Sequence, residues 1–164
     1  MGDLLFDSFF GLPLHPLIVH ATVVFVPTAV VAVLLAAFWG RFRRWAGPGP
    51  MIIALIALIL VPISTQSGEA LEHSLPRTDL IHQHGELADG LLPWVAGLFV
   101  VAAGLWWWNR NQQSPGTAPR WALPRWLVVV LIVGAVVTGV GTTVQVVLIG
   151  HSGAEAAWSG VVTT

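Results

Sequence analysis

Four long apolar runs, separated by short polar segments, organise the chain. They cover about residues 17–39, 51–67, 87–108 and 126–149. A helix rises 1.5 Å per residue and crosses about 30 Å of hydrocarbon in about 20 residues, so each run predicts a transmembrane helix. The second run is short, but the polar residues after Ser64 can continue its helix out of the bilayer. We therefore expect an all-α, integral membrane four-helix bundle, with residues 1–164 forming a single transmembrane domain.

Two groups of glycines have different predicted roles. Small residues let membrane helices approach closely, and the fourth run contains Gly134, Gly139 and Gly141. Gly150 and Gly153 follow that run, and their conformational freedom predicts a tight turn over the mouth of the bundle.

Composition supports the membrane class. Of the 164 residues, 55% are hydrophobic and 9% are charged, against about 25% charged in an ordinary soluble domain. Cysteine is absent, which excludes disulfides and thiolate ligands. A net charge of −1 argues against a nucleic-acid partner. The first residues are acidic where a secretory signal is basic, so we expect no cleavable signal peptide.

The arginines predict the orientation of the bundle. Arg41, Arg43 and Arg44 lie between the first and second runs, and a second group lies between the third and fourth runs: Arg110, Arg120 and Arg125. By the positive-inside rule, both connections are cytoplasmic and both termini are extracytoplasmic. Only Arg77 falls on the outer side.

The same topology brings every acidic residue and every histidine to the outer side. The acidic residues are Asp3, Asp7, Glu69, Glu72, Asp79, Glu86, Asp89 and Glu155, and the histidines are His15, His20, His73, His82, His84 and His151. Outer loops need some polar residues, which accounts for Asp3, Asp7, Glu72 and Asp79. Residues near the bilayer boundary need another explanation, because ionisable groups there usually face the bundle interior and pair with one another.

About 20 residues from its cytoplasmic end, each predicted helix places a polar or ionisable residue at nearly the same depth in the membrane. These residues are His20, Glu69, Asp89 (with His84 just beyond) and Gln145 (with His151 further out). We therefore predict a metal site formed by His20, Glu69, His84 and His151. The residues expected to orient these ligands are His73, Glu86, Asp89, Gln145 and Glu155. We expect His15 and His82 to lie outside the bundle.

Imidazole and carboxylate ligands suit zinc, iron or copper. The alternative cofactor is a b-type haem held by histidines from the set His20, His84 and His151. Haem needs two axial ligands, an apolar slot and basic partners for its propionates, and only Arg77 is available outside. The serines near the site do not indicate a hydrolase, because no Gly-x-Ser-x-Gly motif occurs. The choice between a bare metal and haem stays open.

Several segments resemble a bacterial membrane family known as domain of unknown function 2231. The resemblance rests on the opening Leu14-His15-Pro16-Leu17-Ile18-Val19-His20 and on the closing segment from Gly150-His151-Ser152-Gly153 to Trp158. Thr65–Glu69 and His84–Asp89 are similar to its actinobacterial branch. In other branches the closing segment reads Gly-His-x-Gly-Gly, whereas this chain has Ala154. Some relatives are linked to c-type cytochrome domains, which implies a redox setting. The resemblance also implies that His20, His84, His151 and Glu69 are important.

The sequence therefore predicts a multi-pass protein of the bacterial inner membrane that binds a transition metal or b-type haem. Electron transfer or metal handling is the expected role, with other membrane or redox proteins as partners besides the bilayer. The alternative is a non-catalytic scaffold or accessory subunit of a larger, respiratory membrane complex. Whether the protein is an enzyme stays open, and the sequence favours one that is not a stand-alone enzyme.

Overall fold

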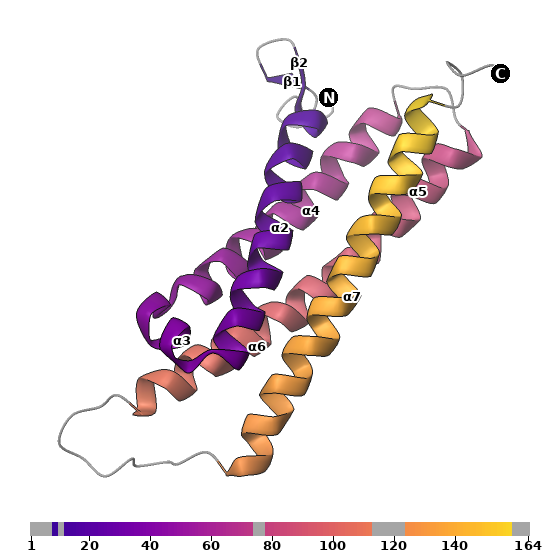
Figure 1. The fold of residues 1–164 in the computed structure, drawn as a ribbon. Helices are drawn as coiled ribbons and strands as arrows, with labels where there is room; N and C mark the ends of the chain where they lie inside the picture. The colour runs from indigo at the N-terminus through magenta and orange to yellow at the C-terminus, as the bar shows by residue number, and fades with distance from the viewer. Residues whose placement is uncertain (1–7, 10–11, 74–77, 113–123, 159–164) are drawn as a thin grey trace.

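Six helices and one short strand pair make up the described structure, which is a computed structural model. It describes residues 8–9, 12–73, 78–112 and 124–158, so Asp3, Asp7, Arg77 and Arg120 lie outside it. Strand β1 (Ser8–Phe9) pairs antiparallel with β2 (Leu12–Pro13). The helices are α2 (Leu14–Phe38), α3 (Gly40–Ala46), α4 (Gly49–Glu72), α5 (Asp79–Asp89), α6 (Leu91–Gln112) and α7 (Arg125–Trp158) (Figure 1).

The four predicted spans are present, and the third and fourth exceed their predicted lengths most, at 34 residues each. By length and composition, His15–Phe38, Gly49–Glu72, Asp79–Gln112 and Arg125–Trp158 can each cross a membrane. Helix α7 has 34 residues, which at 1.5 Å per residue is about 51 Å and exceeds the hydrocarbon thickness. The predicted turn at Gly150 and Gly153 is wrong, because both glycines lie within α7.

Charged groups separate to the two ends of the bundle. Helix α3, the end of α6 and the start of α7 lie at one end (Figure 1), which we call the arginine end (Arg41, Arg43, Arg44, Arg110 and Arg125). The opposite end, which we call the histidine end, holds the start of α2, helix α5 and the ends of α4 and α7. Its described histidines are His15, His20, His73, His82, His84 and His151.

Arg43 caps the end of α2. Trp39, in an extended conformation, separates α2 from α3. Arg43 Nη1 donates to the carbonyl of Ala36 at 2.7 Å and to that of Ala37 at 3.5 Å. These carbonyls are in the last turn of α2 and have no intrahelical donor. The guanidinium also lies 4.1 Å from the Trp108 ring centroid. Burial, and then the charge of Arg44, lower the pKa of Arg43, but a guanidinium stays charged at neutral pH.

Small residues form the contacts between the spans. Lipid chains are as apolar as leucine, so membrane helices associate through close packing of small side chains. Ala29, Ala54, Ala57 and Ala135 are completely buried. Between α6 and α7 the contacts are closer still, and the ring of Trp94 occupies the space where a Cβ of Gly141 would lie.

The third span is broken between α5 and α6 at Gly90. Thr78 caps the start of α5 by accepting a hydrogen bond from the Ile81 backbone N–H at 3.3 Å. At the break, Gln145 Nε2 of α7 donates to the Leu87 carbonyl at 2.6 Å. A Cβ on Gly90 would lie 2.7 Å from Gln145 Nε2, so a glycine is needed for this contact. Residues of α5, on the outer side of this break, line the pocket described next.

Candidate functional site

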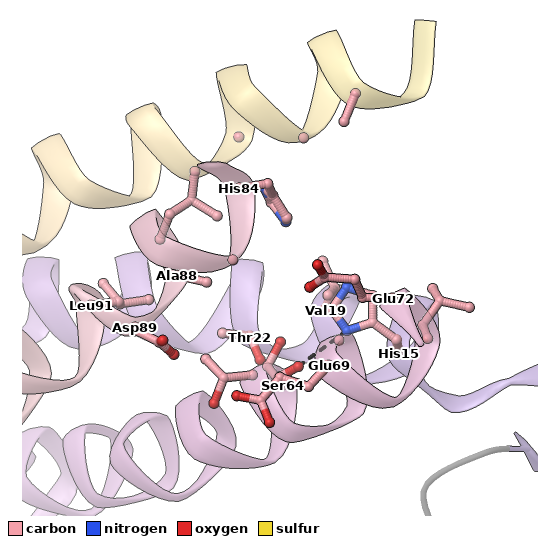
Figure 2. Close-up of a pocket in the computed structure, with 18 of the residues that line it drawn as sticks. His15, Val19, Thr22, Ser64, Glu69, Glu72, His84, Ala88, Asp89 and Leu91 are labelled. Atoms are coloured by element: carbon pink, nitrogen blue, oxygen red, sulfur yellow. Dashed lines mark hydrogen bonds between the residues drawn. The ribbon is translucent and has the colours of Figure 1, made fainter. Parts of the chain in front are cut away.

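A cavity of about 680 Å³ lies at the histidine end, lined by residues of α2, α4, α5, α6 and α7 (Figure 2). Apolar side chains line its inner part, including the buried Val26, Val61 and Leu91. Titratable side chains line its mouth: His15, Glu69, Glu72, His82, His84, Glu86 and Asp89. Pockets of this size and apolar character are typical of small-molecule and cofactor sites.

His15, at the start of α2, is held by two groups of α4. Its Nδ1 lies 3.1 Å from the Ser64 carbonyl oxygen and 3.2 Å from Ser67 Oγ. A carbonyl can only accept, so His15 Nδ1 carries the proton and Nε2 carries the free lone pair. The ring lies over Gly68, where a Cβ would be 3.0 Å from His15 Cε1.

His84, on α5, is held in the same way by α7. Its Nδ1 lies 3.0 Å from Ser152 Oγ, and the Ser152 hydroxyl donates to the Ile149 carbonyl at 3.1 Å. Ser152 Oγ therefore accepts from His84 Nδ1–H, which again leaves the lone pair on Nε2. A Cβ on Gly153 would be 3.0 Å from His84 Cε1.

The pocket thus contains two imidazoles in a defined tautomer. No hydrogen bond to either Nε2 atom occurs among the described residues. Hydrogen bonding of one ring nitrogen, with the other left to the ligand, is the usual arrangement of metal-binding histidines. His15 and His84 are therefore the residues best prepared to bind a metal centre.

Carboxylates line the same pocket as these two rings. Figure 2 shows Glu72 beside His15, with Glu69 and Asp89 nearer to Thr22. The Glu72 carboxylate reaches across from α4 to α5, since a Cβ on Gly85 would lie 3.8 Å from Glu72 Oε2. The mouth of the pocket is accordingly acidic.

The structure does not bring the predicted ligands together. His84 and Glu69 line the pocket, whereas His20 and His151 do not. His20 is exposed on α2, where its Nδ1–H donates to the Pro16 carbonyl. His151 is 73% exposed and lies 3.3 Å from Glu155. In the described part of the chain, no group of three or more histidine, aspartate or glutamate side chains is placed to hold a metal ion.

The residues predicted to orient ligands are also divided. Glu86 and Asp89 line the pocket, but His73, Gln145 and Glu155 do not, and Gln145 instead binds at the α5–α6 break. The prediction that His15 lies outside the bundle is wrong. His82 lines the rim of the pocket, with a side chain that is 70% exposed and 3.7 Å from Glu86.

The error follows from helix rotation. His20 is five residues after His15, so at about 100° per residue the two side chains point about 140° apart. A signal for His15 exists in the sequence: His15, Val19, Thr22 and Val26 have the spacing of one helix face, which continues into the buried Ala29 and Val33. The roles of Ser67 and Ser152 have no comparable signal in the sequence.

Comparison with known proteins gives one match. Residues 11–164 match the model of a family described as predicted membrane protein (DUF2231). Neither the curated proteins nor the solved structures give a significant match.

Proposed function

The chain belongs to the DUF2231 family of predicted membrane proteins, and we propose that its pocket binds a b-type haem through His15 and His84 and serves one-electron transfer. The observation that carries the proposal is the pair of imidazoles, each fixed with its Nδ1 bonded and its Nε2 free. When bound, the haem supplies a one-electron couple whose potential depends on its ligands and surroundings.

The number of available ligands supports haem over a bare ion. Structural zinc is held by four protein ligands, and the described histidines and carboxylates form no group of even three. A haem would need no more than two side-chain ligands from the protein, and His15 and His84 would supply them.

The apolar inner part of the pocket also supports haem. A cavity of about 680 Å³ with Val26, Val61, Leu91 and Val146 on its walls is much larger than an ion needs. A flat, mainly apolar ligand would cover these side chains.

The acidic mouth favours a second candidate, a divalent transition-metal ion. Glu69, Glu72, Glu86 and Asp89 would repel haem propionates that point toward them, whereas they suit a cation. The sequence offers Arg77 as a propionate partner, but it lies outside the described residues. In the second candidate the same two imidazoles bind the ion, and the role is metal handling.

We also infer that the histidine end faces outward across a bacterial inner membrane. Five described arginines lie at the opposite end, and the positive-inside rule places such an end in the cytoplasm. A reporter fused after Thr164 that works only outside the cytoplasm should be active. Activity of a cytoplasm-only reporter at the same position would reverse the orientation.

The cofactor is tested by absorption spectra and metal analysis of the full chain purified in detergent. We expect a Soret band, a shift on reduction and one haem per chain. His15→Ala and His84→Ala should each lose the haem, while His20→Ala and His151→Ala should keep it, since neither residue lines the pocket. A colourless protein with one divalent metal, lost in the same two variants, establishes the second candidate. A colourless, metal-free protein overturns both and leaves an accessory subunit of a larger complex.

A further inference from the structure

The slots that hold His15 and His84 are nearly identical. In each, Nδ1 bonds a serine hydroxyl, that serine donates to the carbonyl three residues earlier, and the next residue is a glycine under the ring. A Cβ placed on Gly68 would lie 3.0, 3.3 and 3.7 Å from Cε1, Nδ1 and Nε2 of His15, and a Cβ placed on Gly153 would lie at the same three distances from the same atoms of His84. We infer that the chain is a tandem repeat of one helical hairpin, with Ser67 and Ser152 as equivalent positioning residues for the two imidazoles.

Helices α4 and α7 show the repeat along their whole common length. A constant shift of 85 residues relates Ser67 to Ser152 and three further pairs of buried positions, while the buried Val61 corresponds to the half-buried Val146. Pro50, Ala54 and Ala57 of α4 correspond to Ala135, Gly139 and Thr142 of α7.

Helices α2 and α5–α6 show it with a shift of 69 residues, which relates His15 to His84. The same shift relates five further buried positions. Thr22, Val26, Ala29, Val33 and Ala36 correspond to Leu91, Val95, Leu98, Ala102 and Leu105. Two amphipathic helices can share a spacing of buried residues without being repeats. Here, however, the shift between the buried positions equals the shift between the histidine slots, and it does so in both helix pairs.

The pocket follows the same two shifts. Of the seven residues of α4 that line it, six have a counterpart that also lines it: Val61, Ser64, Thr65, Gly68, Leu71 and Glu72 correspond to Val146, Ile149, Gly150, Gly153, Ala156 and Ala157. On the other helix pair, His15, Val19 and Thr22 correspond to His84, Ala88 and Leu91.

Packing between the hairpins is also paired. Helix α4 packs against α6, and α7 packs in the same way against α2. Both hairpins begin at the histidine end (Figure 1), so the repeats are parallel and related by an axis along the membrane normal. The pocket lies at the interface between the repeats, where membrane proteins built from repeats commonly bind their ligands.

The two serines should differ in importance in one respect. His15 Nδ1 also contacts the Ser64 carbonyl, whereas His84 Nδ1 has only Ser152 Oγ as a partner among the described residues. Removing the hydroxyl of Ser152 should therefore release its imidazole, and removing that of Ser67 should leave His15 largely in place. The predicted effect on ligand binding rests on the proposed function. The predicted tautomers of the two imidazoles rest only on their hydrogen bonds.

The test is nitrogen NMR of the full chain labelled with ¹⁵N-histidine, in detergent and without ligand, at a pH where imidazole is neutral. His15 and His84, assigned by substitution, should both show the Nδ1–H tautomer. Ser152→Ala should change the tautomer ratio of His84, whereas Ser67→Ala should change that of His15 less. Ser152→Thr keeps a hydroxyl at this position, so His84 should keep its Nδ1–H tautomer. Ser64→Ala is the control, because it keeps the backbone carbonyl and should change neither ring.

The outcomes separate this inference from the proposed function. The positioning role of the two serines is overturned if both rings show the Nε2–H tautomer. It is also overturned if His84 does not respond to Ser152→Ala, even if haem binds. The expected tautomers in a protein that binds neither haem nor metal uphold it while the proposed function fails. In ligand-bound protein, Ser152→Ala should weaken binding by about 10–100-fold and Ser67→Ala by less.

Discussion

The first hairpin, α2–α4, and the second, α5–α7, hold a histidine in the same way but surround it with different chemistry. On α4 the pocket wall is polar, with Ser64, Thr65 and Glu72. The corresponding residues of α7 are Ile149, Gly150 and Ala157. The shared part of the two hairpins is thus the frame that fixes the imidazoles. The differing part gives the pocket one polar and one apolar wall, so an asymmetric ligand would bind in one orientation.

The hairpins also differ in continuity. Helix α2 runs unbroken past Ala21, whereas the corresponding Gly90 separates α5 from α6. Gln145, whose counterpart in the first hairpin is Leu60, donates a hydrogen bond to the Leu87 carbonyl at that break. The second hairpin therefore presents its histidine on a short helix of its own, attached by a specific polar contact.

The largest expected effect comes from filling either histidine slot. Gly68→Val and Gly153→Val would each add methyl groups beyond a Cβ that would itself lie only 3.0 Å from the imidazole. Each ring would be displaced, and bound ligand should fall by at least about 10-fold, as when groups that orient a ligand are lost. Ligand content per purified chain measures this.

The matched control is Gly40→Val at the arginine end, because a Cβ there would make only ordinary contacts, the nearest at 3.5 Å from Arg44 Nη1. A loss of ligand in only one of the two slot variants would contradict the equivalence of the hairpins.

A smaller effect is expected at the helix break. Gln145→Leu gives α7 the residue of its counterpart Leu60 and removes the donor to the Leu87 carbonyl. An acceptor left without its partner costs about 1–3 kcal/mol, so the free energy of unfolding should fall by that amount. Denaturant unfolding in detergent measures it, with Leu60→Met as the control. Unchanged stability would mean that the break needs no support from α7.

The charge difference between the walls should appear in the reduction potential of haem-bound protein. A carboxylate stabilises the oxidised, more positive form, so Glu72→Gln should raise the potential and Ala157→Glu should lower it. A charge several Å away in a partly aqueous site is worth about 1 kcal/mol, or roughly 40 mV for one electron. Spectroelectrochemical titration gives both values. Shifts of the same sign in the two variants would show that the walls do not act through charge.

The smallest effect concerns a buried hydroxyl. Thr142 is completely buried and its Oγ1 has no hydrogen-bond partner among the residues that the structure describes, whereas its counterpart in the first hairpin is Ala57. An unsatisfied buried polar group is destabilising, so Thr142→Val, which keeps the shape, should raise the free energy of unfolding by about 1 kcal/mol. The same denaturant experiment detects it. A loss of stability would mean that Thr142 does find a partner in the membrane.

Sequence alone predicts the spans well because length and apolar character determine insertion. It also predicts that polar groups gather at one end, and Glu69, His84, Glu86 and Asp89 do line the pocket. It failed for His20 and His151 because depth can be counted along a helix, whereas rotation depends on packing. His15 was misassigned since it precedes the apolar run, although its spacing to Val19 and Thr22 marks the buried face. The serine contacts join residues 52 and 68 positions apart, which no local pattern reveals.

The separation of charge described for the fold also has an electrical consequence. Five described arginines occupy one end, and six described carboxylates occupy the other: Glu69, Glu72, Asp79, Glu86, Asp89 and Glu155. The bundle is therefore a dipole along the membrane normal. Moving one elementary charge across a membrane potential of 100 mV changes its electrostatic free energy by about 2.3 kcal/mol. In a membrane that is negative inside, this voltage would favour the orientation proposed above, with the arginine end at the cytoplasmic surface, over the inverted one.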